Sequence, residues 1–174
     1  MTAQATEQIT IDGVSHTLYS LPFDSYIESL NPKPALRFMS TACWRGYIGE
    51  WNIHDRKLYL TKILAQIVND SGSNEVSFDY FFPDSNDEVF AEWFSGILRI
   101  PLSGKSEYYH GGYGHTYDNF MHIEILKGEQ ISISIVDENL LRAERQQAKA
   151  VRSNIEKDKP FAKMVKKFFA KFLK

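Results

Sequence analysis

The sequence changes its pattern near residue 137, and this change constrains the fold more than any other feature. Before it, short segments of alternating or β-branched residues are separated by turn residues such as Asp12-Gly13. Such spacing is typical of strands joined by hairpins. After it, residues 138–159 contain neither glycine nor proline and are rich in helix formers. The pattern predicts an α+β fold: a mainly antiparallel β-sheet or sandwich of about seven to nine strands, followed by two C-terminal helices.

Individual elements can be placed along this pattern. Asp12-Gly13 and Lys127-Gly128-Glu129 each predict a hairpin turn between two strands, and Pro101 predicts the end of a long buried strand. Residues 63–68 fit either a strand or a helical turn. The predicted strands are residues 7–11, 14–19, 44–53, 57–61, 90–100, 107–110, 120–126 and 130–136. A short helix is predicted over residues 23–30, a loop over residues 69–74 and a turn over residues 103–105.

Residues 160–174, PFAKMVKKFFAKFLK, form the second predicted C-terminal helix, which begins at Pro160. Apolar side chains recur at helical spacing, and lysines occupy much of the remaining surface. This stripe could pack on the rest of the chain, contact another protein or lie on an anionic membrane. We expect it to pack on the chain itself, because exposed apolar residues promote aggregation. Its apolar face consists of Phe161, Met164, Val165, Phe168, Phe169 and Phe172.

The formal charge divides at almost the same place as the structural pattern. Residues 1–140 carry nine Lys/Arg against 19 Asp/Glu, a net charge of −10, whereas residues 141–174 carry 11 against three, or +8. An acidic body disfavours nucleic-acid binding, because neutralising phosphates needs Lys and Arg. We expect an acidic β-rich body (1–137) and a basic helical extension (138–174) that belong to one domain.

Cysteine content and hydropathy predict a cytoplasmic protein. The single cysteine, Cys43, cannot form an intrachain disulfide and suits a reducing compartment. The first ten residues lack the basic and apolar regions of a secretory signal, and no window approaches 18 consecutive apolar residues. Cys43 itself is expected to be a small buried apolar residue, and not a reactive thiol.

The segment from Tyr108 to Asp118 holds the most enzyme-like group of side chains. His110, His115 and Asp118 could bind a divalent metal ion, although their spacing matches no recognised ligand frame. Its three glycines could also let backbone N–H groups approach an anion, or simply supply turn conformations in a hairpin loop. The hairpin loop is the favoured interpretation, so we assign no catalytic residue and expect no metal ion or cofactor.

Acidic residues gather in a second loop, Asp84-Ser85-Asn86-Asp87-Glu88. Paired carboxylates can act in catalysis when one is kept protonated in an apolar site, but this loop chemistry favours exposure to solvent. An acidic rim flanked by aromatic residues suits either a solvated loop or a contact with a basic protein. The residues predicted to contact a partner are Asp84, Asp87, Glu88, Tyr109, His110, Tyr113, His115, Tyr117 and Asp118.

Three blocks of the sequence resemble a family of uncharacterised bacterial proteins. They are TACWRGYIGEWNIHDRKLYLTKI (residues 41–63), FAEWFSGILRIP (90–101) and HGGYGHTYD (110–118), about a quarter of the chain. The resemblance implies a bacterial, intracellular, β-rich protein. It transfers no catalytic residues, because the family has no settled activity, and it does not include the lysine-rich tail.

These observations favour a small cytoplasmic binding protein: the immunity partner, or inhibitor, of a bacterial toxin. Such a protein would occlude the basic active site of the toxin with its acidic and aromatic loops. Two alternatives belong to other classes. One is a metal-dependent enzyme that uses His110, His115 and Asp118, and the other is a membrane-peripheral adaptor that residues 160–174 anchor to anionic lipid.

Overall fold

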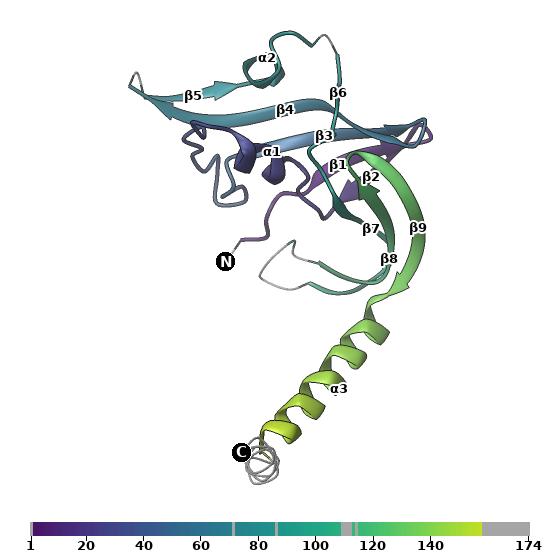
Figure 1. Cartoon of the computed structure of the whole chain (residues 1–174). Helices are drawn as coiled ribbons and strands as arrows, with labels where there is room; N and C mark the ends of the chain where they lie inside the picture. The colour runs from purple at the N-terminus through teal and green to yellow at the C-terminus, as the bar shows by residue number, and fades with distance from the viewer. Residues whose placement is uncertain (1, 71, 86, 109–112, 114, 158–174) are drawn as a thin grey trace, which may run out of the picture. The chain divides into compact units, whose positions relative to one another are not determined.

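The computed structural model describes residues 2–70, 72–85, 87–108, 113 and 115–157. The chain divides into two compact units, Met1–Val136 and Asp137–Lys174, which are treated separately below. The described part of the first unit is built around one nine-stranded sheet with two short helices, which confirms the predicted α+β class (Figure 1).

The sheet has the strand order β2-β1-β3-β4-β9-β8-β7, and β5 and β6 also pair with β4. The two predicted hairpins, around Asp12-Gly13 and Lys127-Gly128, are both confirmed. At their turns Asp12 and Gly13, and likewise Lys127 and Gly128, have the positive φ angles that two-residue hairpin turns require. The strands are β1 (Glu7–Ile11), β2 (Val14–Leu18), β3 (Tyr47–His54), β4 (Lys57–Asn69), β5 (Gly72–Val76), β6 (Val89–Phe90), β7 (Gly96–Tyr108), β8 (His115–Leu126) and β9 (Glu129–Asp137).

The structure settles or corrects several predictions around β4. Residues 63–68 are strand, because β4 runs unbroken from Lys57 to Asn69 between β3 and β5. The loop predicted over residues 69–74 is wrong in its second half, since β5 already begins at Gly72. The sheet is mixed and not purely antiparallel, because β1 pairs parallel to β3 with Ile9 opposite Trp51.

The long strand predicted for residues 90–100 is also wrong. Only its first residue, Phe90, belongs to the short strand β6, residues 91–95 are not strand, and β7 begins only at Gly96. Neither Pro101 nor the turn predicted over residues 103–105 ends β7, which continues to Tyr108 with a register shift after the proline. Proline is tolerated here because β7 is the last strand of the order, so its missing N–H deprives no neighbouring strand.

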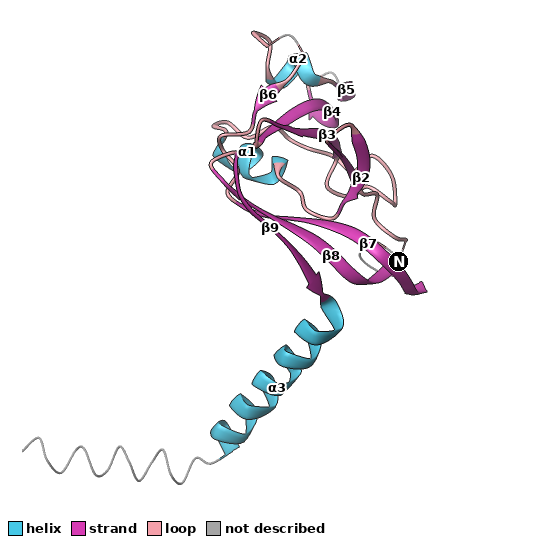
Figure 2. Ribbon diagram, turned by 90° about the vertical axis from the view of Figure 1, so that its right-hand side faces the viewer, coloured by secondary structure: helices cyan, strands magenta, loops and turns pink. Residues whose placement is uncertain are grey.

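The core lies on the concave side of the curled sheet. Alternate residues of β3 and β4 point into it, among them the fully buried Trp51 and Leu60. Helix α1 (Phe23–Ser29) covers this side with Phe23 and Ile27, and α2 (Phe78–Phe81) adds two more buried phenylalanines. Figure 2 shows α1 inside the curl of the sheet, whereas α2 lies beside β5 and β6.

Backbone contacts bring the two ends of the sheet together. Just after β2, the N–H of Tyr19 donates to the carbonyl of Arg99 in β7 at 2.8 Å. The Ser20 hydroxyl donates to the Ile97 carbonyl and accepts from the Arg99 N–H, both at 2.9 Å. Hydrogen bonds therefore connect the end of β2 to β7, although these two strands are not paired as a ladder.

The second unit contains α3 (Glu138–Lys157), which confirms the predicted helix from residue 138. Asp137 caps its start, because the carboxylate oxygen Oδ1 accepts hydrogen bonds from the N–H groups of Asn139 and Leu140 at 2.8 and 3.2 Å. None of the helices in the described residues is long and apolar enough to cross a membrane. The helix predicted from Pro160 lies outside the described residues.

Candidate functional site: an exposed aromatic surface beside β4

The acidic loop predicted to contact a partner lies between α2 and β6. Asp84 and Asp87 are exposed, as expected for a solvated loop. Glu88 is half-buried, and its Oε1 lies 2.9 Å from Nε2 of His54, whose ring stacks on Tyr59 with centroids 4.2 Å apart. Glu88 is therefore held by the body of the protein, and only the two aspartates project freely into solvent.

The second predicted loop packs against the end of β2 where its side chains are described. The ring of Tyr113 lies 4.4 Å from that of Tyr19, and Tyr117 meets the same ring edge-on at 5.8 Å. Burial raises the pKa of the Tyr113 hydroxyl above its ordinary value. These tyrosines thus contribute to packing. Asp118 is half-buried, whereas the side chains of Tyr109, His110 and His115 lie outside the described residues.

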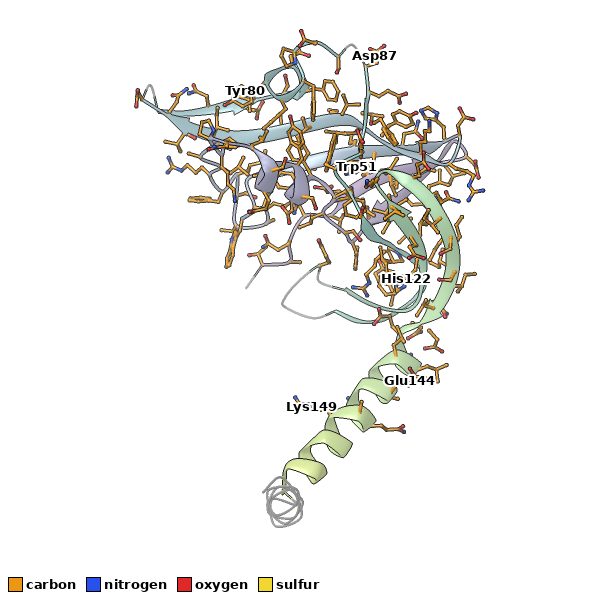
Figure 3. The ribbon with its side chains drawn as sticks, in the orientation of Figure 1. Trp51, Tyr80, Asp87, His122, Glu144 and Lys149 are labelled. Carbon is orange, nitrogen blue, oxygen red and sulfur yellow. The ribbon has the colours of Figure 1, made fainter. Side chains whose placement is uncertain are left out.

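The described parts of the two loops lie next to different parts of the sheet. Figure 3 places Asp87 beside α2, on one side of β3 and β4, and His122 of β8 on the other side. Within the described residues no group of three His, Cys, Asp or Glu side chains could hold a metal ion. The predicted apolar face of the tail, Phe161, Met164, Val165, Phe168, Phe169 and Phe172, falls outside that part of the chain.

A different surface stands out in the structure, formed by Leu36, Arg37, Phe38, Thr41 and Trp44. We call it the Phe38/Trp44 surface. These residues line a concavity of about 470 Å³. Phe38 is 58% exposed and Trp44 60% exposed, and the Arg37 guanidinium lies 5.5 Å from the centre of the Phe38 ring. Two large aromatic side chains beside an arginine are therefore presented to solvent around one shallow hollow.

Backbone hydrogen bonds to β4 hold this segment in place. The N–H of Arg37 donates to the Gln66 carbonyl, and the N–H of Gln66 donates to the Gly46 carbonyl, both at 2.8 Å. Gly46 has φ +81°, and a Cβ atom there would lie 2.5 Å from the Arg37 carbonyl oxygen. The segment thus passes so close to itself at Gly46 that only glycine fits, and isolated β-bridges from Leu36 to Ile67 and from Ser40 to Cys43 also hold it.

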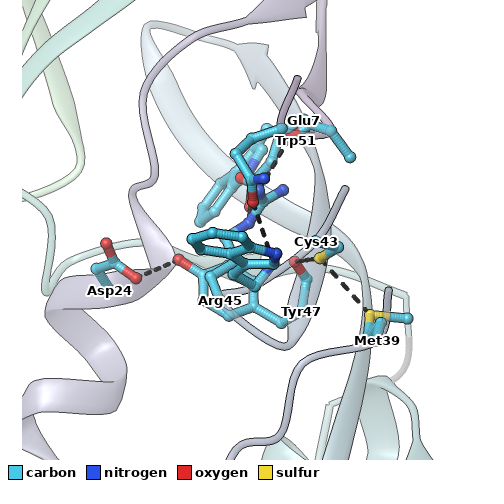
Figure 4. A network of polar contacts seen from close by, with 10 residues as sticks. Glu7, Asp24, Met39, Cys43, Arg45, Tyr47 and Trp51 are labelled. Atoms are coloured by element: carbon cyan, nitrogen blue, oxygen red, sulfur yellow. Dashed lines mark hydrogen bonds and ion pairs between the residues drawn. The ribbon is translucent and has the colours of Figure 1, made fainter. Parts of the chain in front are cut away.

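A buried polar network anchors the residues next to Trp44 (Figure 4). Glu7 has no exposed surface, and its Oε2 accepts a hydrogen bond of 2.6 Å from Nε1 of Trp51. Arg45 Nε lies 3.6 Å from the other carboxyl oxygen, while Arg45 Nη1 donates to the Ala5 carbonyl at 2.8 Å. The N–H of Trp44 in turn donates to Oε1 of Gln4 at 3.1 Å. Residues of the N-terminal segment therefore hold the backbone of Trp44 and the side chain of Arg45 in place.

Burial dominates the electrostatics of this network. Loss of hydration raises the pKa of Glu7 from 4.5 to about 7, although the Trp51 N–H, the Arg45 charge and the Gly49 N–H act in the opposite direction. Because Glu7 is wholly enclosed, we assign the network a structural role in positioning Arg45 and Trp44. Cys43 is buried beside it, as the sequence predicts, with Sγ 3.3 Å from the Tyr47 carbonyl oxygen.

The sequence analysis did not identify the Phe38/Trp44 surface. It assigned Trp44 to a strand, whereas β3 begins three residues later and Trp44 lies in a turn. The available signal was the position of Phe38 and Trp44 after Asn31-Pro32-Lys33-Pro34, a connection that disfavours regular structure. Neither a protein-family model, nor a curated protein, nor a solved structure matches this chain. The resemblance to a bacterial family stays a prediction.

Proposed function

We propose that this protein binds a basic protein partner, a toxin that it neutralises, and that the Phe38/Trp44 surface is the main contact. The observation that carries the proposal is the exposure of two large aromatic side chains on a segment fixed by β4. Exposed apolar patches of this kind mark sites that another molecule covers. Trp and Arg are also the residue types that most often dominate the energy of protein interfaces.

Charge argues for the chemistry of the partner. Residues 1–140 have a formal net charge of −10, so a basic protein would be attracted over long range and its association accelerated. Asp84 and Asp87 are exposed and contribute to this field without sharing the aromatic surface. The aromatic pair supplies the short-range contact, and the acidic body supplies the steering.

The test uses matched substitutions of exposed aromatic residues in the full chain. A basic protein that copurifies from the native source is identified, and its affinity is measured by calorimetry for wild type and variants. Trp44→Ala should raise Kd by at least about 30-fold, the effect of a central interface residue. Tyr80→Ala is the control, because Tyr80 is 52% exposed on α2 and does not line this surface, and it should change Kd less than about twofold.

Two further measurements show whether the variant still folds and whether the captured partner is a toxin that the protein neutralises. Trp44→Ala should melt within a few degrees of wild type, because an exposed side chain contributes little to stability. Wild type, but not Trp44→Ala, should also rescue cells that express the captured partner. Equal affinity of wild type, Phe38→Ala and Trp44→Ala would remove this surface from the proposal, and a partner without toxicity would remove the inhibitor function.

A further inference from the structure

Within the described residues, the β9 strand has an open edge over most of its length. It pairs with β8 on one side, and on the other it meets β4 only at Glu129, which lies opposite Lys57. The N–H of Gln130 still donates to the Arg56 carbonyl at 2.8 Å. Beyond Gln130 no described strand lies against this edge, and Figures 1 and 2 both show β9 on the outside of the β7–β8–β9 layer.

The open stretch has the composition of a strand that pairs, not of a protected edge. Residues 130–136, QISISIV, carry no charge, no proline and no glycine. Ile131, Ile133 and Ile135 are exposed and, being two residues apart, lie on one face. Edges of folded proteins are normally blocked by charges, prolines or bulges, because an uncharged β-branched edge recruits other strands. The described part of the chain shows no such device here.

The direction of the open backbone groups follows from Gln130. Its N–H points toward β4, and backbone groups of an antiparallel strand alternate in direction with a period of two. The N–H and C=O groups of Ser132 and Ser134 therefore point toward the open edge. On the other side β9 is held to β8, where the Ser132 hydroxyl also donates to Oε2 of Glu124 at 3.0 Å.

The open stretch reads the same in both directions: Ile131-Ser132-Ile133-Ser134-Ile135. We propose that it pairs antiparallel with the same stretch of a second copy, around a two-fold axis at Ile133. Ser132 then exchanges both backbone hydrogen bonds with the partner's Ser134, and Ile133 faces the partner's Ile133 as a non-hydrogen-bonded pair. Isoleucine meets isoleucine at every position of one face, as a self-complementary interface requires.

The neighbours of the stretch define its limits. At Glu129 and Gln130 the edge is already occupied by β4, so the partner's strand cannot extend past its own Ile135. The chain leaves β9 just there, since α3 begins at Glu138. The open part of the edge and the self-complementary part of the sequence therefore coincide, and five paired residues is a common length for a strand pairing.

The oligomeric state of the full chain tests the proposal. Sedimentation velocity over a range of concentrations should reach a mass twice the 20.1 kDa of one chain. Ile133→Lys places two ammonium groups at the axis and should return the mass to one chain. Ile97→Lys is the matched control, because Ile97 on β7 has the same 51% exposure as Ile133, and it should remain dimeric.

A cross-linking experiment covers the case in which Ile133→Lys fails to fold. Non-hydrogen-bonded pairs bring Cα atoms to about 4.5 Å, within disulfide range. Mild oxidation should therefore link Ile133→Cys into a covalent dimer, and should link neither Ile97→Cys nor wild type, whose only cysteine is buried.

A monomeric full chain at all concentrations, or a dimer that Ile133→Lys leaves intact, would overturn the proposal. If only the 1–159 truncation dimerises, residues 160–174 are the occupant of the edge, and the proposal is wrong for the full chain. None of these outcomes bears on the Phe38/Trp44 surface, because that surface uses other residues and another kind of partner.

Discussion

The buried carboxyl group of Glu7 should make the stability of this protein fall as pH rises. Burial favours the protonated form in the folded state and raises the pKa of Glu7 from 4.5 to about 7. Between these values the folded state binds more protons than the unfolded state, so the free energy of unfolding decreases with increasing pH. The stabilisation from protonated Glu7 is fully present below about pH 4.5 and is lost as pH rises through 7. The difference in pKa corresponds to roughly 3 kcal/mol.

Glu7→Gln isolates this effect from every other titrating group. The glutamine carbonyl can still accept the hydrogen bond from Trp51 Nε1, and its amide does not ionise. Near pH 4.5 the variant should therefore be about as stable as wild type, whose Glu7 is then protonated. By about pH 8 the variant should be more stable by roughly 3 kcal/mol, because only wild type has to keep a charged carboxylate buried.

Urea unfolding followed by tryptophan fluorescence, at several pH values for both proteins, measures the difference directly. Glu50→Gln is the control on β3, since Glu50 is exposed and pairs with Lys62 at 2.9 Å; its effect should stay below about 1 kcal/mol throughout. A difference between Glu7→Gln and wild type that does not change with pH would refute the reasoning. A wild type that is more stable than Glu7→Gln at high pH would refute it as well, because the attraction between Glu7 and Arg45 would then outweigh the loss of hydration.

Two further outcomes follow from the same physical arguments. Gly46→Ala should destabilise the protein by roughly 1–3 kcal/mol and lower its melting temperature, because the new Cβ would lie 2.5 Å from the Arg37 carbonyl oxygen. Gly13→Ala is the control, because Gly13 has a similar φ but nothing within 4 Å of the new Cβ, so it should lower the stability less. Equal losses in the two variants would show that the contact with Arg37 is not the cause. Deleting residues 160–174 should lower the melting temperature, because the predicted apolar stripe would stabilise by several kcal/mol if it packs on the chain; an unchanged value rejects that packing.

Local chemistry was sufficient to predict much of the fold. The turns at Asp12-Gly13 and Lys127-Gly128 were predictable because residues that tolerate positive φ separate alternating segments. The start of α3 was equally readable, since a run of helix formers follows Asp137, which caps the helix. In each case the information lies within a few adjacent residues, and so does the physical cause.

Strand partners were not predictable, because pairing depends on residues far apart in the sequence. Pro101 reads as a strand end until the sheet order shows that β7 is the last strand, where a missing N–H is harmless. The parallel pairing of β1 with β3 likewise leaves no local signal. Residues 72–74 look like loop because their composition is polar, and only the long partner strand β4 makes them part of the sheet.

The hairpins, the buried cysteine and the change from strands to helix follow from residues that are close in the chain, because these features depend on backbone preference and hydrophobic period. Which aromatic residues are buried depends on the fold. Trp44 and Trp51 are seven residues apart in one predicted strand, yet one is 60% exposed and the other almost wholly buried. The reason is that β3 begins only at Tyr47, so Trp51 points into the core while Trp44 stays on a turn at the surface.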